Sequence, residues 1–302
     1  AGLTTSAVLS VGSIVLLFTM GLNYGIDFEG GTILEAHIPN TQTEDVRHHL
    51  QDNGLDNVSL QELGQPGQYL LRFSMAKELP PEAANEYANE VKEKLTVVWP
   101  DAKFPRTEMV GSKVSGEFAD LTILAMLLAG LGMLLYLWMR FESHFALAAT
   151  ITIMLDLTKT IGFFALAGVE FNLTAVATLL ALMGYSVNDK VVVFDRVREL
   201  LRQEPDMSFY DVLNSSVTST LTRTVFTSGS TILALVPMVV AGGAAVASFA
   251  PPMLFGVVVG TSSSLFVAAP ILYYLGMRRQ SKGLPQLRKS KEELQEELDQ
   301  MP

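Results

Sequence analysis

The sequence predicts an α-helical membrane protein with six transmembrane helices and a small α+β domain, ferredoxin-like (βαββαβ), inserted between the first and second helices. Of the 302 residues, 49% are hydrophobic, and these residues gather in blocks of about 20, the length that crosses a hydrocarbon layer of ~30 Å. A polar stretch of about 90 residues follows the first block. We therefore expect a first transmembrane helix (1–22), the α+β domain (23–115), a five-helix transmembrane region (116–277) and a tail (278–302).

The composition argues against several classes of function. The net charge of −10 disfavours nucleic-acid binding. The chain has no cysteine and four histidines, none of them within an apolar block, so we expect no disulfide, metal or cofactor. The first block lacks a charged leader and a small-residue cleavage site, so we expect a transmembrane helix rather than a signal peptide.

The polar stretch shows the β-α-β-β-α-β order of a split-βαβ domain. Period-two alternation up to Ile38, after a bend at Gly30–Gly31, predicts the first strand. The remaining expected elements are a helix over 43–53, strands over 57–63 and 69–74, a helix from 80 to 95 and a strand over 104–110. No catalytic constellation is visible in this domain, so an enzyme is the least expected class.

Five further apolar blocks predict transmembrane helices over about 121–139, 145–167, 173–194, 217–241 and 251–276. We expect a polar connector over 195–216, with a capping-box-like helix start at Ser208–Asp211. Lys and Arg residues beside the spans fall on one side, at Arg140, in the 195–216 connector and at Arg278–Arg279. This asymmetry predicts that both termini are cytoplasmic and that the α+β domain is extracytoplasmic.

The most informative stretch is GYSVNDKVVVFDRVREL, Gly184 to Leu200, because it places Asp189 inside an apolar helix. A carboxylate there costs roughly 2.5 to 3.5 kcal/mol, and such groups often handle ions or protons. The alternative is a structural ion pair between helices. Lys190 projects about 100° away from Asp189 and does not share its face, and a lysine side chain is long enough that it could extend toward the membrane interface.

A second polar pattern lies on the fifth span, where Arg223 is expected at the depth of Asp189. Hydroxyl residues recur at helical spacing around it and suggest a hydrated face opposite a comparable line that ends at Asp189. Asn188, Thr220, Thr224 and Thr227 are the expected supporting residues. Two such faces with an acid and a base are typical of a proton relay, although an Arg near a helix end can also serve only as an interface anchor.

Two further features concern helix packing. Asp156 and Lys159 lie three residues apart on the third span and share a face, so they form either a structural pair or part of the relay. Gly256, Gly260 and Ser264 form a small-xxx-small seam on the sixth span, which predicts close helix packing.

Several motifs together show a resemblance to a known family. They are GIDFEGGT (25–32), FFALAGVEFNLT (163–174), GYSVND with VVVFDRVRE (184–199), TLTRT (220–224) and GTSSSLFVAAP (260–270). With these motifs the chain resembles the SecF family, the smaller membrane subunit of the SecD–SecF protein-export complex. The resemblance covers nearly the whole chain. It implies half of a resistance–nodulation–division transporter in the bacterial cytoplasmic (inner) membrane, paired with SecD, acting with the SecYEG translocon on unfolded preproteins and driven by protons.

The resemblance also assigns roles to residues. The family's intramembrane acid falls on Asp189 and its partner on Arg223, while another required acid belongs to SecD. Lys190 stands where the family usually has Thr, Lys159 where an apolar residue is common, and Leu155 where a His often occurs. The added cations would change the range over which the relay takes up protons. The alternative functions are a small-molecule or ion exporter of the same superfamily, which a single domain with few aromatic residues argues against, and a passive scaffold.

The expected topology can be tested with reporter fusions. A reporter at Gln65 should be extracytoplasmic and one at Met207 cytoplasmic, because the Lys and Arg residues flank the spans on one side only. Alkaline phosphatase and fluorescent-protein fusions at the two positions measure this directly. The reverse pattern would contradict the orientation.

Overall fold

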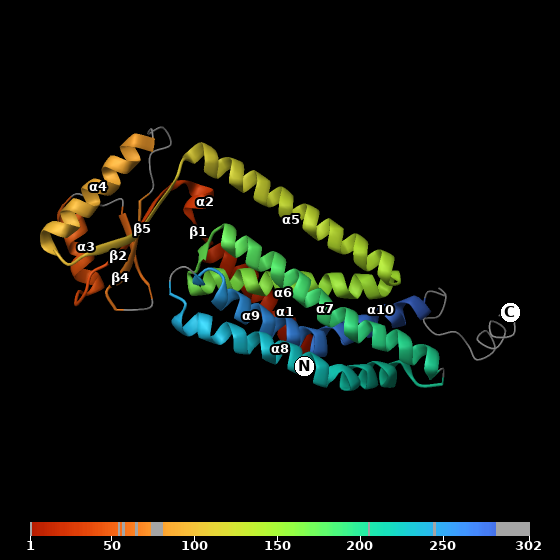
Figure 1. Cartoon of the computed structure of the whole chain (residues 1–302). Helices are drawn as coiled ribbons and strands as arrows, with labels where there is room; N and C mark the ends of the chain where they lie inside the picture. The colour runs from red at the N-terminus through yellow and green to blue at the C-terminus, as the bar shows by residue number, and fades with distance from the viewer. Residues whose placement is uncertain are drawn as a thin grey trace.

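The structure is a computed structural model that describes residues 2–53, 55, 58–63, 66–73, 81–204, 206–243 and 246–281. The ends of two predicted strands, at Asn57 and Ser74, and the tail from Lys282 onward lie outside these residues. The chain forms an α+β domain at one end of a long helical bundle (Figure 1).

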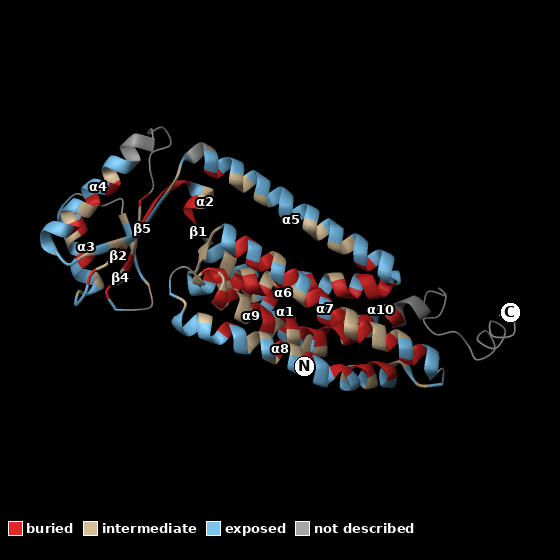
Figure 2. Cartoon of the chain, viewed as in Figure 1, coloured by how far each residue is buried: buried red, intermediate tan, exposed pale blue. Residues whose placement is uncertain are grey.

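Six helices of the described chain are long and apolar enough to cross a membrane, which confirms the six predicted spans. They are α1 (Gly2–Thr19), α5 (Ser112–Arg140), α6 (Ser143–Ala167), α7 (Leu173–Gln203), α8 (Phe209–Ala241) and a last span made of α9 (Ala250–Ser263), the π-helix η2 (Ser264–Ala268) and α10 (Ala269–Ser281). Helices α6 and α7 carry most of the buried residues of the bundle, whereas α5 is exposed along most of its length (Figure 2).

The helices on both sides extend into the predicted polar connector over 195–216. Helix α7 continues to Gln203, because good helix formers follow Asp195 and Val197 and Leu201 are buried. Helix α8 begins at Phe209, where the hydroxyl of its N-cap residue Ser208 accepts a hydrogen bond from the Asp211 N–H at 3.1 Å, as the capping-box prediction required. The connection is therefore limited to 204–208.

The small-residue seam of the last span packs against α7. A Cβ atom added at Gly256 would lie 2.3 Å from Leu182 Cδ1, and one at Gly260 would lie 3.8 Å from Ser186 Oγ. The seam therefore brings the backbone of α9 close to the face of α7 that carries Ser186. The π-helix that follows, at Ser264–Ala268, was not predicted.

The α+β domain contains one four-stranded antiparallel sheet in the order β3-β4-β2-β5. Its elements are β2 (Gly31–His37), α3 (Thr43–Asp52), β3 (Val58–Glu62), β4 (Gln68–Phe73), α4 (Pro81–Val98) and β5 (Lys103–Val110). Both helices cover the same face of the sheet (Figure 1). Leu34, Leu71 and Phe73 from the sheet pack there against Val46 and Val91 from the helices, and all five are buried.

Two short elements before β2 connect the domain to the bundle, and neither was predicted. Strand β1 (Asn23–Tyr24) pairs in parallel with β6 (Glu170–Phe171), which lies between α6 and α7. Helix α2 (Ile26–Glu29) follows, and the chain then turns at Gly30 and Gly31, with φ angles of 74° and 128°. Only glycine adopts such φ values readily, so the predicted bend at this pair is confirmed.

Arg72 on β4 contacts both strands, β1 and β6, at the junction between the α+β domain and the bundle. Its guanidinium donates to the Tyr24 carbonyl and to Asn23 Oδ1 (3.2 Å), and it lies 3.5 Å from Glu170 Oε2. Asp27 Oδ2 accepts from the Leu173 N–H at 2.9 Å, at the start of α7. Burial raises the pKa of Glu170, and the neighbouring Arg72 only partly offsets this effect.

The junction yields a testable prediction for Arg72→Ala. The substitution removes the donor that bridges β4 to β1 and β6, and hydrogen bonds that involve a charged group contribute about 1.5–3 kcal/mol. The Gly25 N–H, which donates to the Phe171 carbonyl at 2.8 Å, should therefore exchange with solvent at least about tenfold faster. Arg47→Ala is the control, because its ion pair with Glu44 is exposed. Equal exchange in the two variants would contradict the role of Arg72.

The same contact should depend on pH through Glu170. Because its pKa is raised in the closed junction, that state binds a proton more tightly than the opened one. Closure should be strongest below the ordinary carboxyl range and should weaken as pH rises through the raised pKa. Glu170→Gln should flatten this dependence of Gly25 exchange. An unchanged dependence in Glu170→Gln would assign it to another group.

Candidate functional site

Four charged side chains are buried inside the bundle on α6 and α7. Their exposed fractions are 5% for Asp156, 4% for Lys159, 3% for Asp189 and 0% for Lys190. Charges in such surroundings are stable only when other groups compensate them. The bonding of each therefore indicates what the site can do.

Asp156 accepts hydrogen bonds from three side chains. Its Oδ2 accepts from Lys190 Nζ and from Ser186 Oγ, both at 2.9 Å, and its Oδ1 accepts from Lys159 Nζ at 3.4 Å. Lys190 Nζ also donates to Ser186 Oγ at 2.6 Å. The predicted Asp156–Lys159 pair is present, but its acid is shared with a second lysine from the neighbouring helix.

Lys190 does not extend to the membrane interface. Its side chain is fully buried and points to α6. The helix geometry of α7 correctly separates Lys190 from Asp189, but a carboxylate on the adjacent helix holds the ammonium inside. With all four groups ionised, the two acids and the two lysines balance.

Asp189 differs from Asp156 because its carboxyl group has no direct partner. Its Oδ2 is buried without a hydrogen bond, and among the described residues it forms no ion pair with Arg223. Arg223 is exposed on α8. Lys190 is the next residue on α7, and Arg223 lies on α8. The structure thus does not bring Arg223 into contact with Asp189.

The predicted supporting residues are only partly inside the bundle. Thr220 and Thr224 are buried, Thr227 is half-buried and Asn188 is exposed. The hydroxyls of Thr220 and Thr227 donate to carbonyls of their own helix, those of Ser216 and Arg223, both at 2.8 Å. This bonding leaves each hydroxyl oxygen with acceptor capacity toward its surroundings.

Sequence reasoning missed a chain of hydroxyl groups one turn from Asp189. Tyr185 donates to Ser228 Oγ at 3.0 Å, Ser228 Oγ lies 2.7 Å from Thr261 Oγ1, and Thr261 Oγ1 donates to the Val257 carbonyl at 2.7 Å. The chain links α7, α8 and α9. Ser186 was also missed. The available signal was its position four residues before Lys190, which places both on one helix face.

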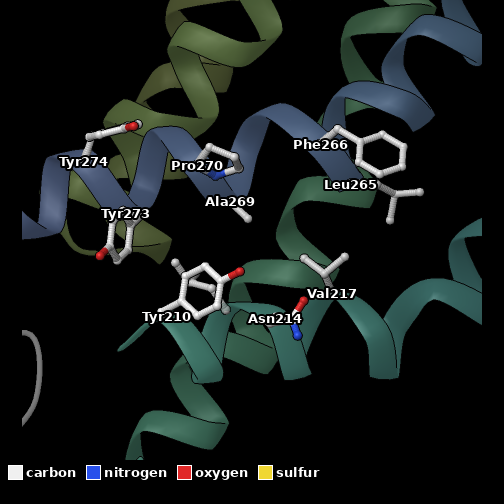
Figure 3. A pocket seen from close by; sticks show the side chains of 10 residues that line it. Tyr210, Asn214, Val217, Leu265, Phe266, Ala269, Pro270, Tyr273 and Tyr274 are labelled. Carbon is white, nitrogen blue, oxygen red and sulfur yellow. The ribbon is translucent and has the colours of Figure 1, made fainter. Parts of the chain in front are cut away.

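A pocket lies elsewhere, between the start of α8 and the η2–α10 segment (Figure 3). It is a groove of about 420 Å³ whose lining includes Tyr210, Leu213, Phe266 and Tyr273. None of the described residues that line it carries a charge. In the described residues, no cluster of three or more His, Asp or Glu could hold a metal.

The six apolar spans, the inserted α+β domain and the charges inside the bundle define a multi-pass helical membrane protein with an intramembrane ionisable site. The family described as "Protein export membrane protein SecD/SecF, C-terminal" matches residues 90–278, and the "SecD/SecF GG Motif" matches residues 15–37. The chain belongs to the SecF family of protein translocase subunits.

Its relatives are similar over most of their length. The protein translocase subunit SecF of Cereibacter sphaeroides is 42% identical over 91% of this chain and 86% of its own. That of Calditerrivibrio nitroreducens is 37% identical over 89% of this chain and 90% of its own. The crystal structure of SecDF from Thermus thermophilus superposes with a TM-score of 0.81 at 29% identity, over 90% of this chain and 37% of the SecDF chain. The present chain therefore spans little more than a third of that protein.

The bonding of Asp156 predicts a large loss of stability in Asp156→Asn. The substitution leaves two buried ammonium groups without a counter-charge, and removing one partner of a buried pair typically costs about 3–5 kcal/mol. Asp195→Asn is the control, because Asp195 pairs with Arg140 at 2.8 Å with both side chains about 40% exposed, and exposed pairs contribute about 0–1 kcal/mol. Thermal unfolding in lipid nanodiscs compares the two. Equal midpoints would contradict a structural role for the shared acid.

Proposed function

We propose that this chain is a proton-driven accessory subunit of the Sec protein translocase. Together with SecD and SecYEG it would promote preprotein export across the cytoplasmic membrane. Membership of the SecF family supports this function. The observation that carries it is Asp189, a buried carboxyl group in a membrane span with a cation on the neighbouring helix and with no direct partner among the described residues.

An unpartnered carboxyl group suits proton binding better than a bonded one. Asp156 is fixed by three donors, so a proton would have to displace ammonium contacts to reach it. Asp189 can gain or lose a proton without breaking a bond of the described structure. Each proton changes the charge inside the bundle by one unit, in surroundings where charge is poorly screened.

The exposure of Arg223 supports the presence of a partner protein at this site. It is exposed on the surface of an apolar span, where a lipid environment is unfavourable for a charge. A second bundle that brings an acid to this face would cover it, and SecD is the partner implied by the SecDF neighbour, which is described as a translocon-associated membrane protein. The relay would then consist of Asp189, Arg223 and an acid of SecD.

The proton gradient supplies enough free energy to drive a conformational change. One charge that crosses 100 mV is worth roughly 2.3 kcal/mol, which shifts a two-state equilibrium about fifty-fold. With both termini in the cytoplasm, as the flanking Lys and Arg residues suggest, the ferredoxin-like domain would lie on the extracytoplasmic side. There it would meet the emerging preprotein. This role requires motion and no covalent chemistry.

The function predicts that Asp189→Asn abolishes the stimulation of export by a proton gradient. Asparagine keeps the shape of the side chain and removes its titration, so the complex should still assemble with SecD. Preprotein translocation is measured in vesicles with and without an imposed gradient, and Asp195→Asn, an exposed acid on the same helix, is the matched control. If Asp189→Asn kept the full stimulation of export by the gradient, Asp189 would have only a structural role and the proposal would be refuted.

A further inference from the structure

The sheet of the α+β domain has two edge strands, β3 and β5, which differ in how well they are protected against pairing with a further strand. Pro105 lies within β5, and the register of β5 against β2 shifts between Glu35 and His37. Proline and irregular register are two devices by which proteins protect a sheet edge. Strand β3 pairs with β4 in unbroken register and contains no proline, lysine or arginine. It can therefore serve as a template for another strand.

The backbone groups on the free side of β3 follow from its pairing with β4. The Leu63 N–H donates to the Gln68 carbonyl at 2.9 Å, so every second residue back along β3 bonds to β4. The residues between them point their N–H and C=O groups away from the partner strand. The N–H of Val58 does so, because it donates to a carbonyl outside the sheet. Leu60 and Glu62 also point outward, and their backbone groups form no hydrogen bond outside the sheet among the described residues.

An apolar groove of about 280 Å³ lies beside this free edge. It is lined by the end of β3, the end of α8, the start of α9 and the segment between these helices, and its lining includes Leu63, Met238, Val240 and Pro251. No described residue of β4, β2 or β5 lines it, so the groove lies beyond β3 and not under the sheet. No described lysine or arginine contributes to it.

We propose that the free edge of β3 and this groove form a docking site for an extended segment of unfolded polypeptide, the preprotein. The segment adds to the sheet as a fifth strand and bonds to the outward N–H and C=O groups of Leu60 and Glu62. Because side chains alternate along a strand, every second side chain of the segment faces the groove. The identity of the polypeptide rests on the proposed function.

The chemistry and the size of the site favour an unfolded chain over a folded subunit. Every residue carries backbone N–H and C=O groups, so pairing with β3 does not require a particular sequence, but it does require an extended conformation. The free edge offers only two residues beside a groove of about 280 Å³. Stable interfaces between proteins bury about 1,200–2,000 Å². The site is therefore suited to transient contact with a passing polypeptide and not to permanent attachment of SecD.

Site-specific photocrosslinking in the complete complex tests the proposal. A photoreactive amino acid in place of Gln61, which is exposed and lines the groove, should crosslink to a preprotein arrested during translocation into vesicles that contain SecD and SecYEG. The matched control is the same amino acid in place of Thr107, which is exposed on the protected edge strand β5 and should give no such crosslink. Crosslinks from position 61 to SecD or SecYEG in place of the preprotein, or no crosslink at all, would overturn the proposal.

A pair of substitutions at Glu62 tests whether the backbone makes the contact. Glu62→Pro removes one outward N–H, and proline is tolerated at an edge position whose N–H faces away from the sheet. Glu62→Ala keeps this N–H and removes only the side chain, which accepts a hydrogen bond from Thr43 Oγ1 at 3.0 Å. The crosslink from position 61 should weaken about fivefold in Glu62→Pro, as expected for the loss of one hydrogen bond, and should persist in Glu62→Ala. Equal crosslinking in the two variants would contradict strand addition.

Amide hydrogen exchange keeps the test decisive if Glu62→Pro does not fold, because it needs no substitution. In the complex with arrested preprotein, the N–H groups of Leu60 and Glu62 should exchange at least about fivefold more slowly than in the complex without it. The N–H of Gln61, which already faces β4, serves as the internal control and should not change. Unchanged exchange at Leu60 and Glu62 would overturn the proposal.

The outcomes separate this inference from the proposed function. If Asp189→Asn loses gradient stimulation while position 61 gives no crosslink to the preprotein, the docking site is overturned and the proton-driven function stands. If the crosslink and the slower exchange are observed while Asp189→Asn keeps full stimulation, the docking site stands and the proton-driven function is refuted.

Discussion

The carboxylate of Asp156 is the constraint on which the interior of this bundle depends. Its two oxygens accept hydrogen bonds from Lys159, Lys190 and Ser186. Moving a carboxylate or an ammonium group from water into a membrane interior costs several kcal/mol. That cost is offset only while all the donors stay in place, so α6 and α7 are fixed in register. The seam at Gly256 and Gly260 lets α9 approach the face of α7 that carries Ser186. The close packing of α9 at this seam and the pairing of Asp156 with the two lysines therefore stabilise the same part of α7.

Helix α7 also provides a rigid connection between the α+β domain and the charged site. Its first N–H groups are capped from two directions, by Asp27 before the domain and by the preceding residue Asn172. Seventeen residues after Asn172, the same helix carries Asp189. One continuous helix therefore joins the junction around Arg72 to the charged site. Under the proposed function, a change of charge at one end would alter the contacts of the domain at the other.

Much of this architecture could be predicted from the sequence, because it depends on local patterns. Block length fixed the number of spans, and alternation with turn residues predicted the strands. The predicted span ended at 194, nine residues before the end of α7, because apolar composition marks the membrane segment and not the end of the helix; the segment after Asp195 has strong helix formers and buries Leu201. Strand β1 was missed because two residues are too few to show the alternation of polar and apolar side chains that predicts a strand. Its partner residues in β6 lie 147 positions later in the sequence.

The sequence predicted which charged residues lie in the site but not which residues they pair with. Helical spacing shows only which side chains share a face of the same helix. That Lys190 points away from Asp189 followed from spacing. The contact between Lys190 and Asp156 depends on how α6 packs against α7, and the sequence pattern of one helix does not show this. The same limit explains Arg223, which is exposed here. The chemistry of the two cations fits this division. An ammonium is a compact charge with three donors and can be shared inside one bundle, whereas a guanidinium pairs with a carboxylate through two parallel bonds and suits contact across an interface. The described part of the bundle thus contains two buried acids and two buried lysines, and under the proposed function the partner of Arg223 comes from another protein.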